Sequence, residues 1–204
     1  MSRNIGPKHK VCRRAGVKLC SAAKCPVTRR NMPPGVHGPK GYQKLTAYGA
    51  QMMEKQKAKN VYGLNERQFA NLVGKARQKT GDTGEHLLNM LELRLDNVAY
   101  RLGLASTRPQ ARQIVTHGHL LVDGKKLTIP SAALKIGQTV SIKEKGKQSV
   151  YFKEMTEKIK SFTPPAWLAL NPAIPEGKIT SMPASLKEMK PLFDLKVVVE
   201  YYGR

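Results

Sequence analysis

The chain of 204 residues has few acidic residues and few aromatic ones, and it has no long apolar run. There are 14 Asp and Glu against 36 Lys and Arg, so the formal net charge is +22. A cationic surplus of this size favours a polyanionic partner. Nothing approaches the roughly 18 apolar residues of a membrane-spanning helix, and no basic amphipathic helix with an aromatic face stands out. We therefore expect a nucleic acid, and no membrane, as the partner.

Cysteine is also scarce, with three residues in the chain. An odd number of cysteines behind an N-terminus without an apolar signal core favours reduced thiols or metal ligands over disulfides. His9-x2-Cys12 and Cys20-x4-Cys25 form two close pairs, seven residues apart. Three thiolates and one imidazole suit a tetrahedral structural zinc, whereas a [4Fe–4S] cluster prefers four thiolates. The alternative is scattered cysteines that bind nothing.

Motifs that carry catalysis are missing as well. The sequence has no P-loop, no glycine-rich dinucleotide turn after a strand, no H-E-x-x-H and no G-x-S-x-G. His117 and His119 flank Gly118 at a turn, where phosphate contact is a simpler account than acid–base chemistry. We expect no enzyme, no small-molecule substrate and no cofactor other than zinc.

The basic residues are concentrated at the N-terminus. Residues 1–53 contain 11 basic residues and no acidic one, which is half of the net charge. Five prolines and little apolar periodicity predict that residues 1–45 form a basic arm, which carries the candidate zinc site and orders against phosphates. Helix-forming residues then predict helices over Thr46–Lys59 and Glu66–Arg77, which make residues 46–91 a small helical domain.

Residues 92–146 have the pattern of two helices and a hairpin. One apolar helix face is predicted from five residues spaced three and four apart: Leu88, Leu91, Leu95, Val98 and Leu102. Arg94, Asn97 and Arg101 share another face, which we expect to point outward. Thr107 and Pro109 predict the start of the second helix, on which Arg108 and Arg112 also point outward.

The hairpin is predicted from Asp123-Gly124, which supplies the positive φ angles of a type I′ turn. This register places Leu120 and Val122 on one face with Leu127 and Ile129, and residues 139–143 alternate as a third strand.

The last 58 residues, 147–204, are predicted as a helix, a proline-rich connection and a strand. Residues 149–161 have a helical apolar pattern, and the β-branched run in Leu195–Tyr201 favours a strand. Trp167 stands in an apolar run, so we expect a packing anchor rather than a base-stacking residue.

Several motifs of the central region resemble a small RNA-binding module found in a ribosomal protein family, some RNA-modifying enzymes and some aminoacyl-tRNA synthetases. They are Arg-Leu-Asp-Asn at 94–97, Thr-Arg-Pro-Gln-Ala-Arg at 107–112, His-Gly-His at 117–119 and Val-Asp-Gly-Lys at 122–125. Earlier motifs extend the resemblance almost end to end, to the family of bacterial-type small ribosomal subunit protein four. They include Pro-Gly-x-His-Gly at 34–38, Glu-Lys-Gln-Lys at 54–57, Glu-Arg-Gln-Phe at 66–69 and Thr-Gly-Glu at 83–85.

The resemblance implies an α+β fold in which the RNA-binding module is inserted and the C-terminal tail returns to the helical domain. It implies a structural constituent of the small ribosomal subunit, in the cytoplasm, that binds a junction in the 5′ domain of 16S-type rRNA and nucleates assembly. It also implies contacts with ribosomal proteins three and five, a role in translational accuracy, and contact with mRNA where it enters the subunit. Where the family often has several arginines facing mRNA, this chain has only Lys40 and Lys44, so we expect weaker unwinding of mRNA.

Some members of that family bind zinc through cysteine pairs spaced C-x2-C and C-x4-C. This chain keeps both spacings, with His9 in the first position and a shorter connection between the pairs. The resemblance therefore supports His9, Cys12, Cys20 and Cys25 as the zinc ligands.

The predicted RNA-binding residues are basic and polar residues of the arm, the helical domain and the RNA-binding module. They are Arg13, Arg14, Lys40, Lys44, Lys55, Lys57, Arg94, Asn97, Arg101, Arg108, Arg112, His117, Lys125 and Lys126. We expect Arg108→Ala or Arg112→Ala to weaken RNA binding without unfolding the module. The module also occurs fused to catalytic domains of well over a hundred residues, for which the 58 residues after Gly146 leave no room. The remaining alternative is a ribosome-associated RNA-binding or RNA-chaperone factor.

Overall fold

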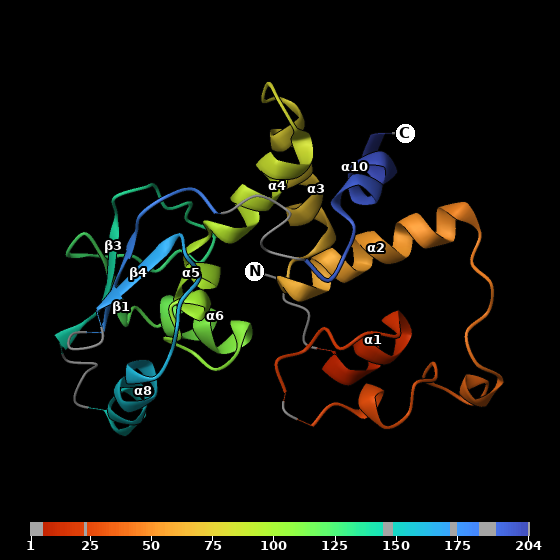
Figure 1. Ribbon diagram of the computed structural model, residues 1–204, viewed down its shortest axis with the longest axis horizontal. Coiled ribbons are helices and arrows are strands. Elements are labelled where there is room, and N and C mark those ends of the chain that lie inside the picture. The colour runs from red at the N-terminus through yellow and green to blue at the C-terminus, as the bar shows by residue number, and fades with distance from the viewer. Residues whose placement is uncertain (1–5, 23, 145–148, 172–174, 184–190, 204) are drawn as a thin grey trace. The chain divides into compact units, whose positions relative to one another are not determined.

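The computed structural model describes residues 6–22, 24–144, 149–171, 175–183 and 191–203 (Figure 1). The chain divides into two compact units, one made of residues 1–87 with 190–204 and the other of residues 88–189. The second unit is continuous in sequence and is inserted into the first. No helix among the described residues is long and apolar enough to cross a membrane.

The arm has more regular structure than its composition predicts. It contains the helix α1 (Lys8–Ala15) and two short 3-10 helices, η1 (Pro26–Thr28) and η2 (Gly38–Lys40). The hydroxyl of Tyr42 donates to the carbonyl oxygen of Arg13 at 2.7 Å. Contacts between residues far apart in sequence therefore join parts of the arm to one another, and the expectation that the arm orders against phosphates stays a prediction.

Two of the predicted helices of the first unit are confirmed as α2 (Ala47–Val61) and α3 (Glu66–Arg77). The hydroxyl of Thr46 caps α2 by accepting from the amide of Gly49 at 3.1 Å, and a capping box at Asn65 begins α3. Their apolar faces share a buried core with the C-terminal segment: Ala58, Phe69, Val73, Ala76, Leu195 and Val198.

The C-terminal segment is a helix, α10 (Leu195–Gly203), so the prediction of a strand there is wrong. Local β propensity loses to tertiary packing, because Leu195 and Val198 are buried and α10 contacts both α2 and α3. The carboxylate of Asp194 accepts from the amide of Lys196 at 2.9 Å, which satisfies an amide at the start of the helix.

The predicted continuous helix through Leu88–Leu102 is two helices, α4 (Thr83–Glu92) and α5 (Leu95–Arg101). At the break the amide of Leu95 donates to the carbonyl of Ala132, and the amide of Leu134 donates to the carbonyl of Leu93, both at 2.9 Å. A loop more than 35 residues away in sequence therefore takes over the backbone hydrogen bonds that a continuous helix would use.

The second predicted helix is confirmed as α6 (Arg108–Thr116), with Thr107 as its cap. The hairpin is also confirmed, since Asp123 and Gly124 have φ angles of 48° and 77° between β1 (Leu120–Val122) and β2 (Lys125–Lys126). Beside β1 lies the predicted third strand, β3 (Thr139–Ile142). Ile129 does not share the buried face predicted for it with Leu120 and Val122, because it is 53% exposed.

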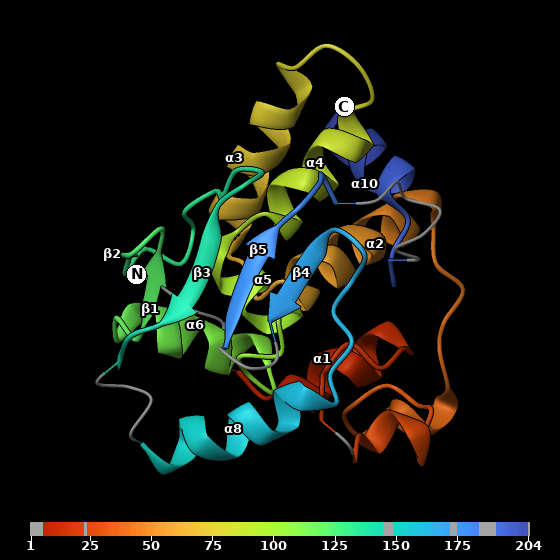
Figure 2. The same cartoon turned by 60° about the vertical axis from the view of Figure 1, so that its left-hand side comes forward.

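Among the described residues, the sheet of the second unit has five antiparallel strands in the order β2-β1-β3-β5-β4. Its last two strands, β4 (Leu168–Asn171) and β5 (Glu176–Ile179), come from the segment predicted as a proline-rich connection. Figure 2 shows α5 and α6 against one face of this sheet. The helix α8 (Val150–Lys160), which confirms the prediction over residues 149–161, contributes Phe152, Met155 and Ile159 to the same core.

The C-terminal segment is divided between the two units. The segment up to residue 189 belongs to the second unit, and only residues 190–204 return to the first. Trp167 is 1% exposed within the core of the second unit, as expected of a packing anchor.

Candidate RNA interface and metal site

Glu92 is the centre of a buried polar cluster at the junction of α4 and α5. Its side chain is fully buried and accepts from the amide nitrogen of Asn97 at 2.7 Å. The guanidinium of Arg101 donates to both carboxylate oxygens, from Nε at 3.0 Å and from Nη2 at 2.9 Å. Such bidentate, charge-assisted hydrogen bonds fix the direction of an arginine as well as its position.

Asp96 anchors a second pair of arginines one turn further on. It accepts from Arg94 through Nε at 3.0 Å and Nη2 at 2.8 Å, and from Nη1 of Arg112 at 3.1 Å. Arg108 completes the cluster, since its Nε donates to Oδ1 of Asn97 at 2.9 Å.

The prediction that these side chains all point outward is wrong for Arg94 and Asn97, which are 5% and 2% exposed. Arg101, Arg108 and Arg112 are half-buried, and each is held by the same network. The cluster holds four guanidinium groups and two carboxylates, so it keeps a net positive charge while its geometry is fixed. The sequence pattern does not reveal this ordered cation cluster, because no periodicity marks Glu92 and Asp96 as its anchors.

Exposed cations lie on the hairpin that follows α6 in the chain. Lys125 and Lys126 form β2 and are exposed, and His117 at the end of α6 is exposed too. The Asp123 carboxylate accepts from the backbone of Thr139 and the side chain of Gln138, which lowers its pKa. The one acidic group of the turn is thus used to fasten the hairpin to β3.

Two predicted RNA contacts on α2 have structural partners. Lys55 is 5% exposed, donates to Glu66 at 2.8 Å and lies 4.7 Å from the ring centroid of Tyr201. Lys57 pairs with Glu54 at 2.6 Å. These contacts are internal to the first unit, so the structure gives Lys55 and Lys57 a packing role that the sequence did not reveal.

The pair formed by Lys55 and Glu66 also ties α10 to α2 and α3. The hydroxyl of Tyr202 donates to Glu66 at 2.7 Å. Partial burial raises the pKa of Glu66, but hydrogen bonds from Lys55, Tyr202 and Lys59 outweigh it and lower the pKa to about 2. Burial and the neighbouring Glu66 carboxylate raise the pKa of Tyr202.

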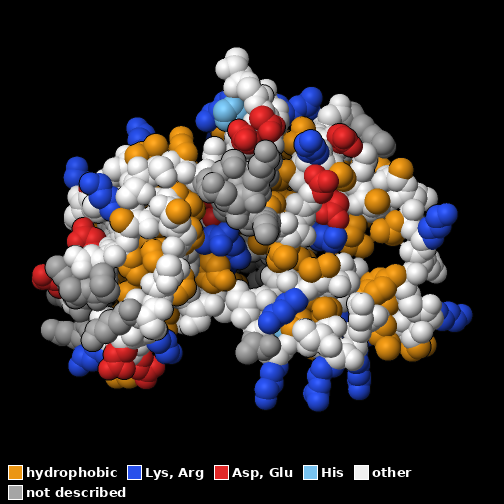
Figure 3. All heavy atoms as spheres, viewed as in Figure 1, with side chains coloured by type: hydrophobic (Ala, Val, Ile, Leu, Met, Phe, Trp, Pro, Cys, Tyr) orange, Lys and Arg blue, Asp and Glu red, His pale blue; other side chains and the backbone are white. Residues whose placement is uncertain are grey.

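In the arm, Arg13 is half-buried and donates to the carbonyls of Met32 and Pro33 at 3.1 and 2.9 Å, so it holds the arm together. Arg14, Lys40 and Lys44 are exposed, as contact with a phosphate backbone requires. Figure 3 shows Lys and Arg side chains that project from the arm, whose sequence contains no acidic residue.

Three further exposed cations of the arm, Lys24, Arg29 and Arg30, are not among the RNA-binding residues predicted from the sequence. They surround an open hollow of about 890 Å³ beside η1. The turn is held by the hydroxyl of Thr28, which donates to the carbonyl of Cys25 at 2.7 Å. The sequence feature that could have identified these three cations is the run of basic residues in a segment that contains no acidic residue.

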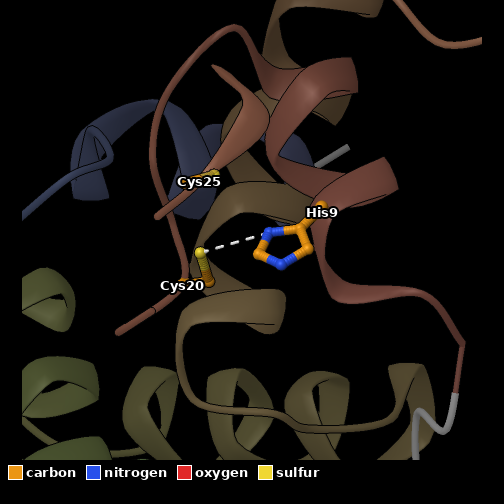
Figure 4. Close-up of side chains that lie close together, drawn as sticks. All are labelled: His9, Cys20 and Cys25. Carbon is orange, nitrogen blue, oxygen red and sulfur yellow. Dashed lines mark hydrogen bonds between the residues drawn. The ribbon is translucent and has the colours of Figure 1, made fainter. Parts of the chain in front are cut away.

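The candidate metal ligands come together as predicted, with one qualification. The ligand atoms of His9, Cys20 and Cys25 all lie within 4.8 Å of one another, and Nδ1 of His9 is 3.7 Å from the Cys20 sulfur (Figure 4). The buried Cys12 lies outside that group of three but beside the Cys20 thiol.

The thiols differ in their proton affinity. Burial raises the pKa of Cys12 to about 11. Burial also raises the pKa of Cys20, but hydrogen bonds from the backbone of Ala22 and from the thiols of Cys25 and Cys12 outweigh it and leave that pKa below the ordinary value. The His9 imidazole and the Cys20 and Cys25 thiols are N and S donors of the kind that bind zinc in structural sites.

Comparison with known proteins gives the family of the chain. The family described as "Ribosomal protein S4/S9 N-terminal domain" matches residues 3–92, and the family described as "S4 domain" matches residues 93–140. "Small ribosomal subunit protein uS4" of Roseiflexus castenholzii is 42% identical over 207 residues, with all of both chains covered. The protein of the same name from Halothermothrix orenii is 44% identical over 210 residues, again with full coverage.

The chain belongs to the uS4 family. This confirms the resemblance drawn from the motifs. In this uS4 chain the S4-domain match contains α5, α6, β1 and β2, and hence most of the anchored arginine cluster and the exposed cations of the hairpin. The strands β4 and β5 lie beyond the matched residues but complete the same sheet.

Proposed function

We propose that this uS4 protein is a structural constituent of the small ribosomal subunit that binds the 5′ domain of 16S-type rRNA and nucleates assembly of the subunit body. The observation that carries the proposal is the positively charged cluster in which Glu92 and Asp96 orient the arginines, in the same unit as the exposed Lys125 and Lys126. A pre-oriented cationic surface on a rigid helix pair suits a folded RNA, whose phosphates have fixed positions.

The binding mechanism follows from the charges. Lysines and arginines that meet phosphates release counterions, and this release supplies much of the affinity. Sequence is poorly readable in the deep groove of A-form RNA, so specificity comes from the fit to the shape of a junction. Binding needs no chemical step, and we propose a structural rather than an enzymatic role.

We further propose that His9, Cys12, Cys20 and Cys25 hold a structural zinc. The support is the clustering of the His9 imidazole with the thiols of Cys20 and Cys25, and the Cys12 thiol beside that of Cys20, in an arm that has little apolar core of its own. A bound zinc supplies folding free energy to the arm by joining α1 to the turn at η1.

The zinc proposal is tested by the metal content of the purified protein. We expect one zinc per chain, lost in Cys12→Ser and in His9→Ala but kept in His9→Cys. The control is His37→Ala, because His37 is an exposed arm histidine outside the cluster. A wild-type protein that is free of zinc and equally stable after treatment with a chelator would overturn the assignment.

Contacts with ribosomal proteins three and five, contact with mRNA and an effect on translational accuracy are proposals that rest on the family resemblance. Lys40 and Lys44 are both exposed, as contact with mRNA requires. With only these two lysines in that segment, we expect weak assistance to mRNA unwinding.

The decisive test of rRNA binding is filter binding of the whole protein to the 5′ domain of small-subunit rRNA and to a scrambled RNA of equal length, across a salt series. We expect a preference for the 5′ domain that persists at about 0.3 M salt, where non-specific binding to phosphates has largely disappeared. If the protein bound both RNAs equally and lost both at the same salt concentration, the result would instead favour a general ribosome-associated or RNA-chaperone role.

A further inference from the structure

The second unit contains a hollow of about 540 Å³ beside the anchored arginine cluster. Its walls come from the end of α5 with Gly103, Ala105 and Ser106, and from Met155 and Lys158 of α8 with residues 162–165. The lining includes two aromatic residues, Tyr100 and Phe162, and two cationic residues, Arg101 and Lys158. None of the described residues that line it is acidic.

Phe162 forms a fixed aromatic wall rather than a core side chain. It is 41% exposed, and its amide donates to the carbonyl of Ile159 at 3.0 Å at the end of α8. Its ring lies against Gly103, where an added Cβ would be 2.9 Å from Cδ1 of the ring. Because Gly103 has no side chain and a φ of +76°, the ring can rest on the backbone there and keep one part open to solvent.

The opposite wall is also ordered. The guanidinium of Arg108 stacks 4.5 Å from the ring centroid of Tyr100, which ties this wall to the arginine cluster. The hydroxyl groups of Ser106 and Thr163 also line the hollow and can each donate and accept a hydrogen bond.

We propose that this hollow receives one unstacked nucleobase of the RNA, with Phe162 as the stacking platform and Lys158 at the flanking phosphate. The inference rests on the proposed RNA-binding function and adds a specific subsite to it. Aromatic rings combined with cations and a few hydroxyls are the means by which proteins bind bases that are splayed out of a helix. The cations, and the lack of an acid among the described lining residues, favour a nucleotide over an apolar side chain of a neighbouring protein as the occupant.

The first test measures the affinity of Phe162→Ala and Phe162→Tyr for the 5′-domain rRNA across a salt series. Loss of base stacking is expected to raise the Kd of Phe162→Ala about tenfold. The slope of log K against log salt should stay unchanged, because the same number of phosphates is still neutralised. Phe162→Tyr should bind like the wild type, and Lys158→Gln should reduce the slope by the equivalent of about one phosphate. Urea unfolding of each variant checks that the fold is intact.

The matched control is Ile136→Ala, because Ile136 is 51% exposed in the same unit but does not line the hollow. It should leave both affinity and slope unchanged. An unchanged Kd in Phe162→Ala, or an equal loss of affinity in Ile136→Ala, would overturn the base-binding subsite. The proposed function would still stand if the wild type preferred the 5′ domain.

The second test identifies the base by replacing unpaired nucleotides of the RNA, one at a time, with abasic residues. One such position should weaken binding of the wild type about tenfold and have no further effect on Phe162→Ala, because both changes remove the same interaction. If no position is coupled to Phe162 in this way, the subsite is refuted. Loss of affinity for a neighbouring ribosomal protein in Phe162→Ala, with RNA binding intact, would likewise refute it and favour an apolar partner.

Discussion

At the scale of single residues, two buried carboxylates organise the arginines of the RNA interface. Glu92 is completely buried and bonds Asn97 and Arg101, while Asp96 bonds Arg94 and Arg112. Removing one partner of a buried ion pair leaves the other without compensation, which costs more free energy than the pair itself contributes. The acidic residues of this basic protein therefore matter both for stability and for the direction of its cations.

We predict that Glu92→Ala lowers the free energy of unfolding of the second unit by about 3 kcal/mol, because Asn97 and Arg101 lose their shared acceptor. Arg101 has 29% of its side chain exposed and can be partly rehydrated, which keeps the cost near the lower end for buried pairs. Urea unfolding measures the change. The exposed Glu85 in the same helix α4 provides the control, and Glu85→Ala should change the stability little. Equal effects of the two variants would contradict the prediction.

We predict that Arg112→Ala changes both stability and RNA binding, whereas Lys126→Ala changes RNA binding alone. Arg112 bonds the nearly buried Asp96, so its loss should lower the free energy of unfolding by about 1–3 kcal/mol and also weaken RNA binding. This revises the expectation that Arg112→Ala spares the fold. Lys126 is exposed, so its loss should leave the unfolding midpoint unchanged and reduce the salt dependence of RNA binding by the equivalent of about one phosphate. A stable Arg112→Ala would argue against the anchored cluster.

At the scale of elements, the carboxylate of Glu66 helps to join the C-terminal helix α10 to α2 and α3. Glu66 accepts from Lys55, Lys59 and Tyr202, and Tyr202 packs against Phe69 with ring centroids 6.0 Å apart. A segment that favours a strand by composition is thereby held as a helix, since its buried face packs on other helices and Tyr202 bonds to one of them.

This arrangement predicts an acid-dependent stability of the first unit. The pKa of Glu66 lies below its ordinary value, at about 2, so ionised Glu66 stabilises the fold above about pH 4.5. That contribution is lost as the pH falls from about 4.5 toward 2. Glu66→Gln should be less stable at pH 7 and should show a smaller loss of stability across this window than the wild type, as measured by thermal unfolding against pH.

The control is Glu200→Gln, because Glu200 is exposed and its hydrogen bond from Gln51 is long at 3.5 Å. It should keep the slope of the wild type across the same acidic window. An unchanged slope in Glu66→Gln would show that other carboxylates cause the acid sensitivity.

At the scale of the whole molecule, the positive charge is concentrated in one part of the chain and is not distributed evenly. Half of the net charge of +22 lies in residues 1–53, where no acidic residue occurs. Of the basic residues of the arm, Arg13 is used for internal hydrogen bonds, whereas Lys24, Arg29 and Arg30 are displayed around η1. The turn that displays them begins at Cys25, one of the candidate zinc ligands.

We predict that replacing Lys24, Arg29 and Arg30 together with Gln reduces the slope of log K against log salt for rRNA binding by about 0.7–0.9 for each phosphate that is no longer neutralised. The slope is measured by filter binding between about 0.1 and 0.3 M salt. The matched control replaces three exposed cations of α3 and its end, Arg67, Lys75 and Lys79, with Gln. If both triple variants reduced the slope equally, the total charge rather than its position at η1 would decide the affinity.

The sequence by itself determined the features that depend on neighbouring residues. The helices α2, α3, α6 and α8, the type I′ turn at Asp123-Gly124 and the concentration of charge in the arm were all predicted, because propensity, caps and turn geometry are local. The family motifs are local too, and they led to the correct family.

The tertiary structure alone decided the features that depend on residues far apart in the chain. The break between α4 and α5 is made by hydrogen bonds to residues 130–134, and β4 and β5 become strands by pairing that starts at β3. The inward direction of Arg94 and the packing of Lys55 follow from carboxylate partners that the fold brings to them, which no periodicity reveals. A buried backbone amide or charged group pairs with a partner that lies close to it, and the whole fold determines which groups are buried together.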